Sequence, residues 1–250
     1  MRIAVLAKVV SDYEIPPSIF ELDGNRIKDQ YNRLIGLYDE HAAEVAIQLA
    51  EKTGSEVEVI SYGIKSDSAV LRKLLARGAT SLTMILGEDD DPLLVASECS
   101  KIIKEKQFDI VLAGRQSSDL ERGVVPGLIA AMLNIPYVTN VKQIELDKGY
   151  MILIKQIKGG IMNIKAIPPV IVSVTDDPSN IPRVPTVRGV LQAKKKPVNY
   201  IESTISAKSS VEEISVGIQR VEYECEILPS DNLEQTADLL IEKLKKERVL

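Results

Sequence analysis

Polar side chains of several kinds gather in the segment Ala113–Gly123, which follows a continuous apolar run. Gly114 permits close backbone approach, Ser117 and Ser118 supply hydroxyls, and a helical pattern begins where the segment ends. Backbone N–H groups at the start of a helix favour a phosphate. The spacing is neither G-x-G-x-x-G nor a Walker loop. Two interpretations therefore stay open: a phosphate-binding loop, or a polar cap in which Ser118 or Asp119 begins an ordinary helix.

Two shorter segments also follow predicted strands. Asp12 and Tyr13 come after the apolar run Val5–Val9, and Tyr62-Gly63-Ile64 ends an alternating stretch. In an open parallel sheet, ligands bind beyond the carboxyl ends of the strands. We therefore expect all three segments to border one site, and we expect a valine at Gly114 to enter the ligand.

Several residue types that catalysis commonly needs are scarce. The chain has a single histidine, His41, two cysteines and no tryptophan. A zinc site needs three or four histidine, cysteine or carboxylate ligands close together, and so few histidines and cysteines make a zinc site unexpected. His41 falls in the first turn of a predicted helix, where we expect a solvated or hydrogen-bonded imidazole rather than a general base. Cys99 and Cys225 lie in apolar patterns typical of small buried side chains. The composition therefore favours binding over self-contained catalysis.

Length and charge narrow the classes of protein further. The 250 residues suit one large domain or one domain with appendages. An apolar content of 45% and a net charge of −5 exclude bulk disorder, and the acidic balance disfavours nucleic acid as a partner. No uncharged apolar run reaches about 18 residues, so no membrane insertion is expected. Without disulfide spacing, the cytoplasm is the expected compartment.

Apolar periodicity alternates between strand and helix from Ile3 to Leu133. This rhythm predicts an α/β fold with a doubly wound, mainly parallel sheet. The predicted strands are Ile3–Val10, Glu56–Tyr62, Ser81–Leu86 and Phe108–Ala113. The predicted helices are Asp39–Glu51, a helix from Ser66 or Asp67 to Gly78, Pro92–Lys106 and Gly123–Leu133.

The pattern changes after Leu133. Two β-rich stretches, Gln143–Leu146 and Tyr150–Ile157, flank Asp147-Lys148-Gly149, which predicts a β-hairpin excursion. Gly159-Gly160 predicts a second turn into Ile161–Ile167, and Val170–Val174 predicts one more buried strand.

The remaining chain predicts an appendage. Residues 176–199 hold four prolines and five basic side chains, which indicates an extended segment without a regular element. Asp231–Lys246 is a predicted helix, capped by Asp231 with Glu234, and its apolar stripe is Leu233, Ala237, Leu240 and Leu244. We place a nucleotide-binding α/β domain at residues 1–199 and a C-terminal arm, ending in this helix, at residues 200–250.

Five short motifs, in order along nearly the whole chain, carry a family resemblance. They are Ile3–Val10 followed by Asp12-Tyr13, the turn Tyr38-Asp39-Glu40-His41-Ala42, the helix end Ala76-Arg77-Gly78-Ala79, the loop Ala113–Asp119, and the segment from Pro182-Arg183 to Lys194-Lys195-Lys196. The chain resembles the β subunits of electron transfer flavoproteins, including relatives in carnitine- and nitrogen-fixation-linked electron pathways. The resemblance implies a nucleotide-binding fold of the adenine nucleotide α-hydrolase type.

The resemblance implies an electron carrier subunit and not an enzyme by itself. It implies a heterodimer whose α subunit holds the redox-active FAD, with electrons passing between an acyl-CoA or other flavin dehydrogenase and a downstream acceptor. In this subunit it implies structural AMP, or FAD where the complex bifurcates electrons. The implied nucleotide contacts are Leu6, Gly36, Leu37, Tyr38, Asp39, Tyr62, Gly114, Arg115, Gln116, Ser117, Ser118, Asp119, Gly123, Val124 and Val125.

The resemblance also implies contacts with partners. Tyr13 and Tyr38 match aromatic positions that face the flavin of the α subunit. Val187 matches the docking position of a recognition loop at about residues 176–196, which also holds Arg183 and Arg188. The terminal helix is expected to pack on the α subunit. The chain departs from the family pattern with Gly36-Leu37 in place of Asn-Pro, Val124 in place of Gln and Pro126 in place of Gly.

Two functions of other classes compete with this interpretation. A nucleotide-hydrolysing or nucleotidyl-transferring enzyme on the same sheet would need a Gly-rich loop near the first strand, and Ala7–Tyr13 contains no glycine. A stand-alone adenine-nucleotide-binding sensor would need neither the basic, proline-rich segment nor the terminal helix. A colourless monomer would favour the sensor, and a yellow heterodimer would favour the carrier.

Overall fold

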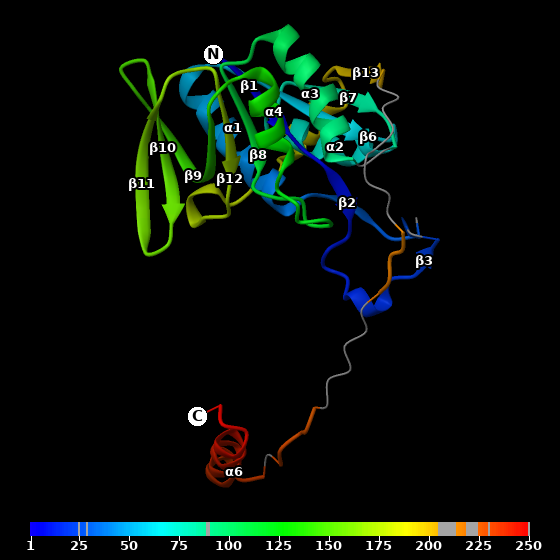
Figure 1. Ribbon diagram of the computed structural model, residues 1–250, viewed down its shortest axis with the longest axis vertical. Coiled ribbons are helices and arrows are strands. Elements are labelled where there is room, and N and C mark those ends of the chain that lie inside the picture. Colours follow the sequence, from blue (N-terminus) through cyan, green and yellow to red (C-terminus); the bar gives the residue numbers. More distant parts are fainter. Residues whose placement is uncertain are drawn as a thin grey trace.

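Nine strands form the central sheet of the computed structural model, which describes residues 1–24, 26–28, 30–88, 91–204, 214–218, 225–229 and 231–249. Their order is β11-β10-β9-β12-β8-β1-β6-β7-β13 (Figure 1). All neighbours from β9 to β13 in this order pair in parallel. The strands of this part other than β9 are β1 (Arg2–Leu6), β6 (Glu56–Gly63), β7 (Ser81–Leu86), β8 (Ile110–Gly114), β12 (Val170–Val174) and β13 (Val198–Glu202).

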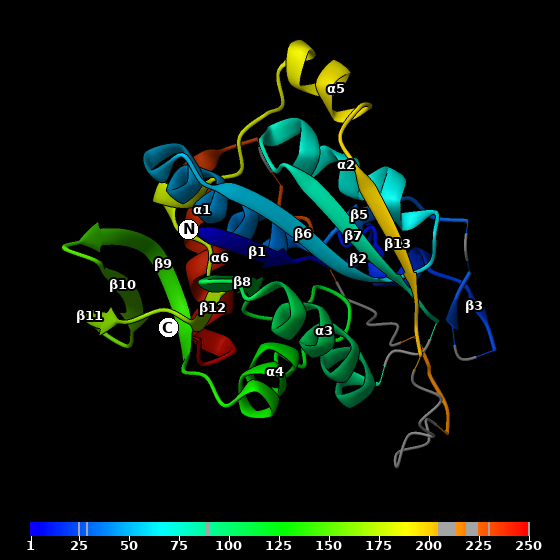
Figure 2. The same ribbon diagram turned by 90° about the horizontal axis from the view of Figure 1, so that it is seen from above.

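Helices cover both faces of this sheet. Helices α1 (Leu37–Thr53) and α2 (Asp67–Arg77) lie on one face, and α3 (Pro92–Lys106) and α4 (Val125–Leu133) lie on the other (Figure 2). Successive residues of β1 point to opposite faces, so Ile3 belongs to the core beneath α1 and α2, whereas Ala4 belongs to the core beneath α3 and α4. The predicted doubly wound, mainly parallel fold is confirmed.

Strand β1 is the point where the winding reverses. The chain passes from β1 outward to β6 and β7, and it then returns to β8 on the other side of β1. Such a switch point leaves a crevice beyond the carboxyl ends of the two strands that flank the reversal. The crevice here lies beyond β1 and β8.

The antiparallel excursion is also present. Strands β9 (Tyr137–Asp147), β10 (Tyr150–Ile157) and β11 (Gly160–Ala166) form a meander at one side of the sheet. Lys148 and Gly149 both have positive φ angles, 47° and 86°, as the tight hairpin turn requires.

The predicted strand Ile3–Val10 is divided, because β1 ends at Leu6 and a separate strand begins at Val9. The other small elements between β1 and α1 had no indication in the sequence patterns. Strand β2 (Val9–Ser11) pairs with β5 (Arg33–Ile35), and β3 (Leu22–Asp23) pairs with β4 (Arg26–Ile27). A 3-10 turn, η1 (Pro17–Ile19), precedes β3.

The prediction that residues 176–199 lack regular structure is wrong. The segment contains a 3-10 turn, η2 (Pro178–Asn180), the helix α5 (Val187–Ala193) and the first residues of β13. The Thr186 hydroxyl accepts a hydrogen bond from the Gly189 N–H (3.0 Å) and caps α5. A Cβ on Gly189 would lie 2.3 Å from the Ala76 carbonyl oxygen, so α5 packs closely on α2. Pro178 is the first residue of η2, and the other three prolines stand before α5 or β13.

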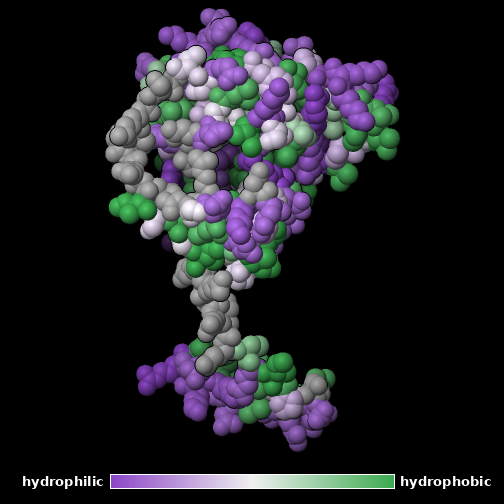
Figure 3. All heavy atoms as spheres, turned by 90° about the vertical axis from the view of Figure 1, so that its right-hand side faces the viewer, coloured by the Kyte–Doolittle hydropathy of each residue, from purple (hydrophilic) through white to green (hydrophobic). Residues whose placement is uncertain are grey.

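The predicted terminal helix exists as α6 (Leu233–Lys246), but Asn232 caps it instead of Asp231. The Asn232 side chain accepts hydrogen bonds from the N–H groups of Glu234 (3.0 Å) and Gln235 (3.4 Å). None of residues 233–246, all of which the structure describes, is buried. Figures 1 and 3 show α6 apart from the α/β body, with apolar and charged side chains both at its surface.

The two cysteines differ in their surroundings. Cys99 is buried in α3, as predicted, and burial raises its pKa to about 12. Cys225 is exposed, so the prediction that both are buried is wrong for this residue. In the parts of the chain that the structure describes, no helix is long and apolar enough to cross a membrane.

Candidate functional site

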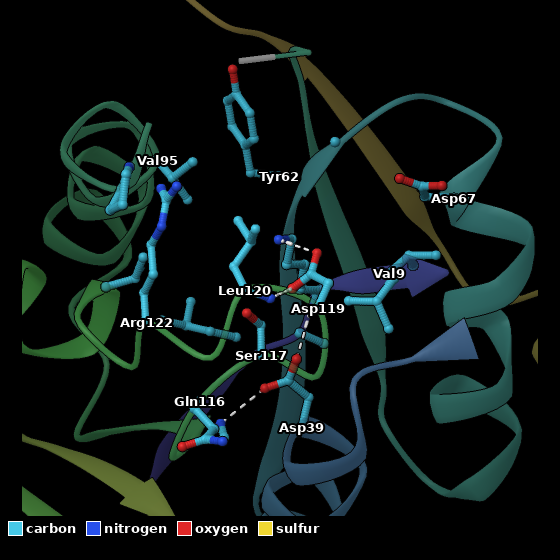
Figure 4. A pocket seen from close by; sticks show the side chains of 18 of the residues that line it. Val9, Asp39, Tyr62, Asp67, Val95, Gln116, Ser117, Asp119, Leu120 and Arg122 are labelled. Carbon is cyan, nitrogen blue, oxygen red and sulfur yellow. Dashed lines mark hydrogen bonds and ion pairs between the residues drawn. The ribbon is translucent and has the colours of Figure 1, made fainter. Parts of the chain in front are cut away.

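A cavity of about 560 Å³ lies beyond the carboxyl ends of β1, β6 and β8, at the switch point of the sheet (Figure 4). The three segments expected to border one site contribute unequally, because Tyr62-Gly63-Ile64 and the loop after β8 line it, whereas Asp12 and Tyr13 do not. Ten of the implied nucleotide contacts line the cavity: Leu6, Asp39, Tyr62, Gly114, Gln116, Ser117, Asp119, Gly123, Val124 and Val125.

The other five implied contacts do not line the cavity. They are Gly36, Leu37, Tyr38, Arg115 and Ser118. The Ser118 hydroxyl accepts a hydrogen bond from the N–H of Leu37 (3.0 Å), so it ties the loop to the start of α1. Ser117 is therefore the hydroxyl of this pair that faces the cavity.

Asp39 joins the ends of the two strands that flank the switch point. Its carboxylate accepts hydrogen bonds from the N–H groups of Lys8 (2.8 Å) and Gly114 (2.9 Å). Burial outweighs these two donors and raises the pKa of Asp39 to about 7. The side chain thus holds the first turn of α1 against the floor of the cavity.

This contact explains why a glycine stands at position 114. A Cβ there would lie 2.5 Å from Oδ1 of Asp39 and 2.8 Å from Cβ of Tyr38. A valine at Gly114 would collide with α1, and the expected loss of the ligand in that variant stays a prediction. Gly114 serves the close approach of strand and helix.

The loop after β8 is longer than the sequence pattern indicated. Helix α4 begins at Val125, and its N-cap residue, Val124, makes no side-chain capping bond. The interpretation in which Ser118 or Asp119 caps the helix is therefore wrong. The first turn of α4 borders the cavity, since Val124, Val125 and Pro126 all line it, and it carries no acidic residue.

Ion pairs stabilise two sides of the cavity. The Lys8 ammonium lies 2.6 Å from Oδ2 of Asp119, and the Arg33 guanidinium lies 2.9 Å from Oδ1 of Asp67. Burial alone would raise the pKa of Asp119, but Lys8 holds it below its ordinary value. Lys8 therefore links the end of β1 to the loop after β8.

Comparisons with known proteins show the family of the chain. The family model described as the electron transfer flavoprotein domain matches residues 25–206. The chain belongs to the electron transfer flavoprotein family. The electron transfer flavoprotein subunit beta of Bacillus subtilis is 31% identical over 206 residues, which are 81% of this chain and 79% of that protein. Its counterpart in Thermoanaerobacterium thermosaccharolyticum is 29% identical over 263 residues and covers 100% of both chains.

A third relative comes from a yeast. The probable electron transfer flavoprotein subunit beta of Saccharomyces cerevisiae is 29% identical over 261 residues, which are 100% of this chain and 98% of its own length. Membership in the electron transfer flavoprotein family implies a flavin-associated electron carrier.

The two tyrosines that the family pattern singles out lie outside the cavity lining. The Arg115 guanidinium stacks over the Tyr38 ring, 4.3 Å from its centroid, and donates a hydrogen bond to the Tyr38 hydroxyl (2.6 Å). Tyr13 is partly buried, and burial is the main cause that raises its pKa. The negative charges of nearby carboxylates, above all Glu40, raise it further. Tyr38 is therefore held in one orientation by a cation.

The residues predicted for partner docking also differ from one another. Val187 is 80% exposed, and Arg188 is exposed as well. Arg183 instead pairs with Glu44 (2.8 Å) and Glu51 (2.5 Å) of α1. Its guanidinium fixes the recognition segment to the body, and its contact with a partner stays a prediction.

His41 has a structural partner. Its Nδ1 lies 2.8 Å from Oδ1 of Asn180 and 3.0 Å from the Asn180 carbonyl oxygen. The expectation of a hydrogen-bonded imidazole is confirmed. This contact fixes η2 to α1 on the side of the helix that faces the recognition segment.

Some lining residues were missed by sequence reasoning. Leu120 and Arg122 lie inside the range Gly114–Val125, which the family resemblance assigns to the nucleotide, but neither side chain was given a specific role. Lys28, Tyr31 and Arg33 come from the short elements between β1 and α1, where no periodic pattern signals a strand. The charge of Arg122 next to a helix start was the one signal in the sequence that could have identified it.

Proposed function

We propose that this chain is the β subunit of a heterodimeric electron transfer flavoprotein and binds AMP structurally in the cavity. Electrons pass between dehydrogenases and a downstream acceptor through FAD, which the α subunit mainly holds and which supplies the redox chemistry. The observation that carries the proposal is the cavity at the switch point, lined by ten of the residues that the family pattern assigns to the nucleotide.

The lining suits an adenine nucleotide. Apolar residues at the strand ends, Leu6, Ile60 and Ala113, offer a surface for a base, and the loop after β8 offers backbone N–H groups and the Ser117 hydroxyl. The volume of about 560 Å³ falls within the range typical of small-molecule sites. Asp39, Lys8 and Gly114 hold this loop in position and have a structural role.

Acid extraction of the purified complex, followed by chromatography, tests this assignment. We expect one AMP for each copy of this chain, besides the flavin. A complex that contains flavin but no adenine nucleotide beyond it would contradict the assignment of the cavity.

FAD is the second candidate for the same cavity, as in an electron-bifurcating complex. The cavity continues beyond the strand ends to Ile27, Lys28 and Tyr31. This extension provides room and polar groups for a ligand longer than a mononucleotide. In that case, the same extraction yields two FAD and no AMP for each heterodimer.

The recognition segment is the proposed docking site for partner dehydrogenases. Val187 and its neighbours Ile181, Val184 and Leu191 are 59–86% exposed on the surface of the segment. Arg183 and the Thr186 cap hold the backbone in place, so little conformational entropy is lost when a partner binds. Val187 is the proposed apolar anchor, with Arg188 beside it.

The arm is proposed to bind the α subunit. Leu233, Leu240 and Ile241 of α6 are 43–79% exposed, and such a stripe is stable in water only when another surface covers it. The proposed domain boundary between residues 199 and 200 falls inside β13, so the body extends at least to Glu202. Tyr13 and Tyr38 are proposed to face the flavin of the α subunit.

A further inference from the structure

Strand β11 ends the central sheet with a free edge. Among the described residues it pairs with β10 alone, and the register runs without a shift from Ile157↔Gly160 to Met151↔Ala166. Figure 1 shows β11 at the outer side of the meander, away from the rest of the body. The backbone groups on such an edge have no strand partner, so they can pair with a strand of another chain.

The geometry of the hairpin shows which backbone groups point outward. A two-residue turn joins β10 to β11, so the pair next to the turn, Ile157↔Gly160, is hydrogen-bonded within the hairpin. The N–H and C=O groups of successive residues alternate between the two edges of a strand. The groups of Ile161, Asn163 and Lys165 therefore point away from β10.

Strand β11 lacks the features that usually protect an edge strand. Natural edges carry prolines, bulges or charged side chains that prevent pairing, but β11 contains no proline and pairs with β10 without a bulge. The ammonium of Lys165, its one charged side chain, lies 3.4 Å from the centroid of the Tyr150 ring and is held over β10. Ile161 and Met162 are 58% and 47% exposed. The edge is thus open to backbone pairing and has apolar side chains to bury.

The sequence of β11 is complementary to itself. In an antiparallel pair centred on Asn163, Ile161 of one copy lies opposite Lys165 of the other, and Met162 lies opposite Ile164. This register pairs all three outward residues, whereas a centre at Met162 or Ile164 leaves one of them without a partner. Like charges directly opposite each other destabilise a sheet, and this register brings none together.

We infer that two copies of this chain associate through β11, antiparallel about a two-fold axis at Asn163, so that the two meanders form one continuous sheet. This inference does not depend on the proposed carrier function. Helix α6 and helix α5 of the recognition segment lie away from β11 (Figures 1 and 2), so this contact leaves both free. Because a contact along one strand is smaller than a standard interface, we expect a dissociation constant in the micromolar range.

Sedimentation velocity of the full-length chain between about 1 and about 200 μM tests the contact, and the unmodified chain should pass from monomer to dimer. Ile161→Lys places a second ammonium opposite Lys165 and should weaken the dimer at least about tenfold. Ile161→Glu places a carboxylate there and should keep the dissociation constant within about threefold. Ile19→Lys is the matched control, because Ile19 is also 58% exposed but belongs to η1, and it should change nothing.

A backbone variant provides a second test. Asn163→Pro removes an N–H that points away from β10, a position at which edge strands tolerate proline. It should abolish the dimer and leave the circular dichroism of the chain unchanged.

Four outcomes would overturn the inference. A chain that stays monomeric at every concentration has no such contact. A dimer that Ile161→Lys and Asn163→Pro leave intact uses another surface, such as α6. Equal weakening by Ile161→Lys and Ile161→Glu would contradict the register centred on Asn163. Loss of α-subunit binding in Ile161→Lys, measured by calorimetry, would identify the α subunit as the partner of this edge in place of a second copy.

Discussion

Helices α3 and α6 have nearly the same length and a similar alternation of apolar and charged residues, but their surroundings differ. In α3, Leu94, Cys99, Ile102 and Ile103 are at most 7% exposed against the sheet. In α6, no residue is buried, and Leu233 is 79% exposed. The periodicity of an amphipathic helix therefore shows that a face must be covered, but it does not show whether the same chain covers it. The difference distinguishes the body, whose helices are covered by its own sheet, from the arm, which we propose binds a partner.

Placing a charge on each apolar face should produce the largest contrast. Ile103→Asp buries a carboxylate without a partner in the core of α3 and should reduce the free energy of unfolding by about 4 kcal/mol or more. Leu240→Asp places the same group on the exposed face of α6 and should leave the unfolding of the isolated chain unchanged. Urea unfolding of both variants measures the contrast. Equal destabilisation would show that α6 belongs to the core of the body.

Removing α6 should affect assembly and not folding. Each leucine that a partner covers contributes about 1.5–3 kcal/mol. A chain that ends at Pro229 should therefore bind the α subunit at least about a hundredfold more weakly, while its thermal unfolding midpoint stays the same. Titration calorimetry with the α subunit and thermal unfolding test the two parts. Native affinity in the shortened chain would show that the arm is dispensable, and loss of its fold would place α6 in the core.

The body was more predictable than its connections for a physical reason. Buried parallel strands and their covering helices have strong local periodicities, which is why β6, β7 and α3 were predicted close to their observed bounds. Helix α5 was missed because its stability comes from a threonine cap and from close packing on α2, and neither contact leaves a periodic pattern. The approach of Gly114 to α1 was missed for the same reason, since it joins residues far apart in the chain.

In the candidate site, too, local composition was predictable and long-range contacts were not. The segment after β8 was identified from its polar composition, but the direction of its side chains depends on the φ angles of Glu121 and Gly123. The pairing of Arg183 with α1 likewise depends on how the recognition segment folds back over the body. Composition therefore located the loop and the segment, and only the tertiary structure divided their residues between binding and support.

The raised pKa of Asp39 can be tested by the pH dependence of the stability of the body. Its pKa is about 7 in the folded chain, above the ordinary value of 3.8, so folding favours its protonated form. This contribution to stability is complete below about pH 4 and is lost as the pH rises to about 7. In the ligand-free chain, Asp39→Asn should therefore flatten the fall in unfolding free energy between pH 4 and pH 7. Parallel pH profiles of the two proteins would contradict the raised pKa.

The smallest effect is expected at the recognition segment. Val187→Ala removes part of an exposed anchor, so the rate of electron transfer from a partner dehydrogenase should fall a few-fold while flavin content stays normal. Ile161→Val, a truncation at a side chain of β11 that is 58% exposed and lies outside the segment, serves as the control. Stopped-flow reduction of the flavin compares the variants. Equal rates in all three proteins would show that Val187 is not part of the docking surface.

The most direct test of the proposed carrier function is the composition of the complex that forms around this chain. The full-length chain, tagged and purified from its native source, should yield a yellow one-to-one heterodimer. Mass measurement and flavin absorbance should then show an α subunit with bound FAD, and dilution should not release this chain from it. A colourless monomer that retains only an adenine nucleotide would contradict the account and identify the chain as a stand-alone nucleotide-binding protein.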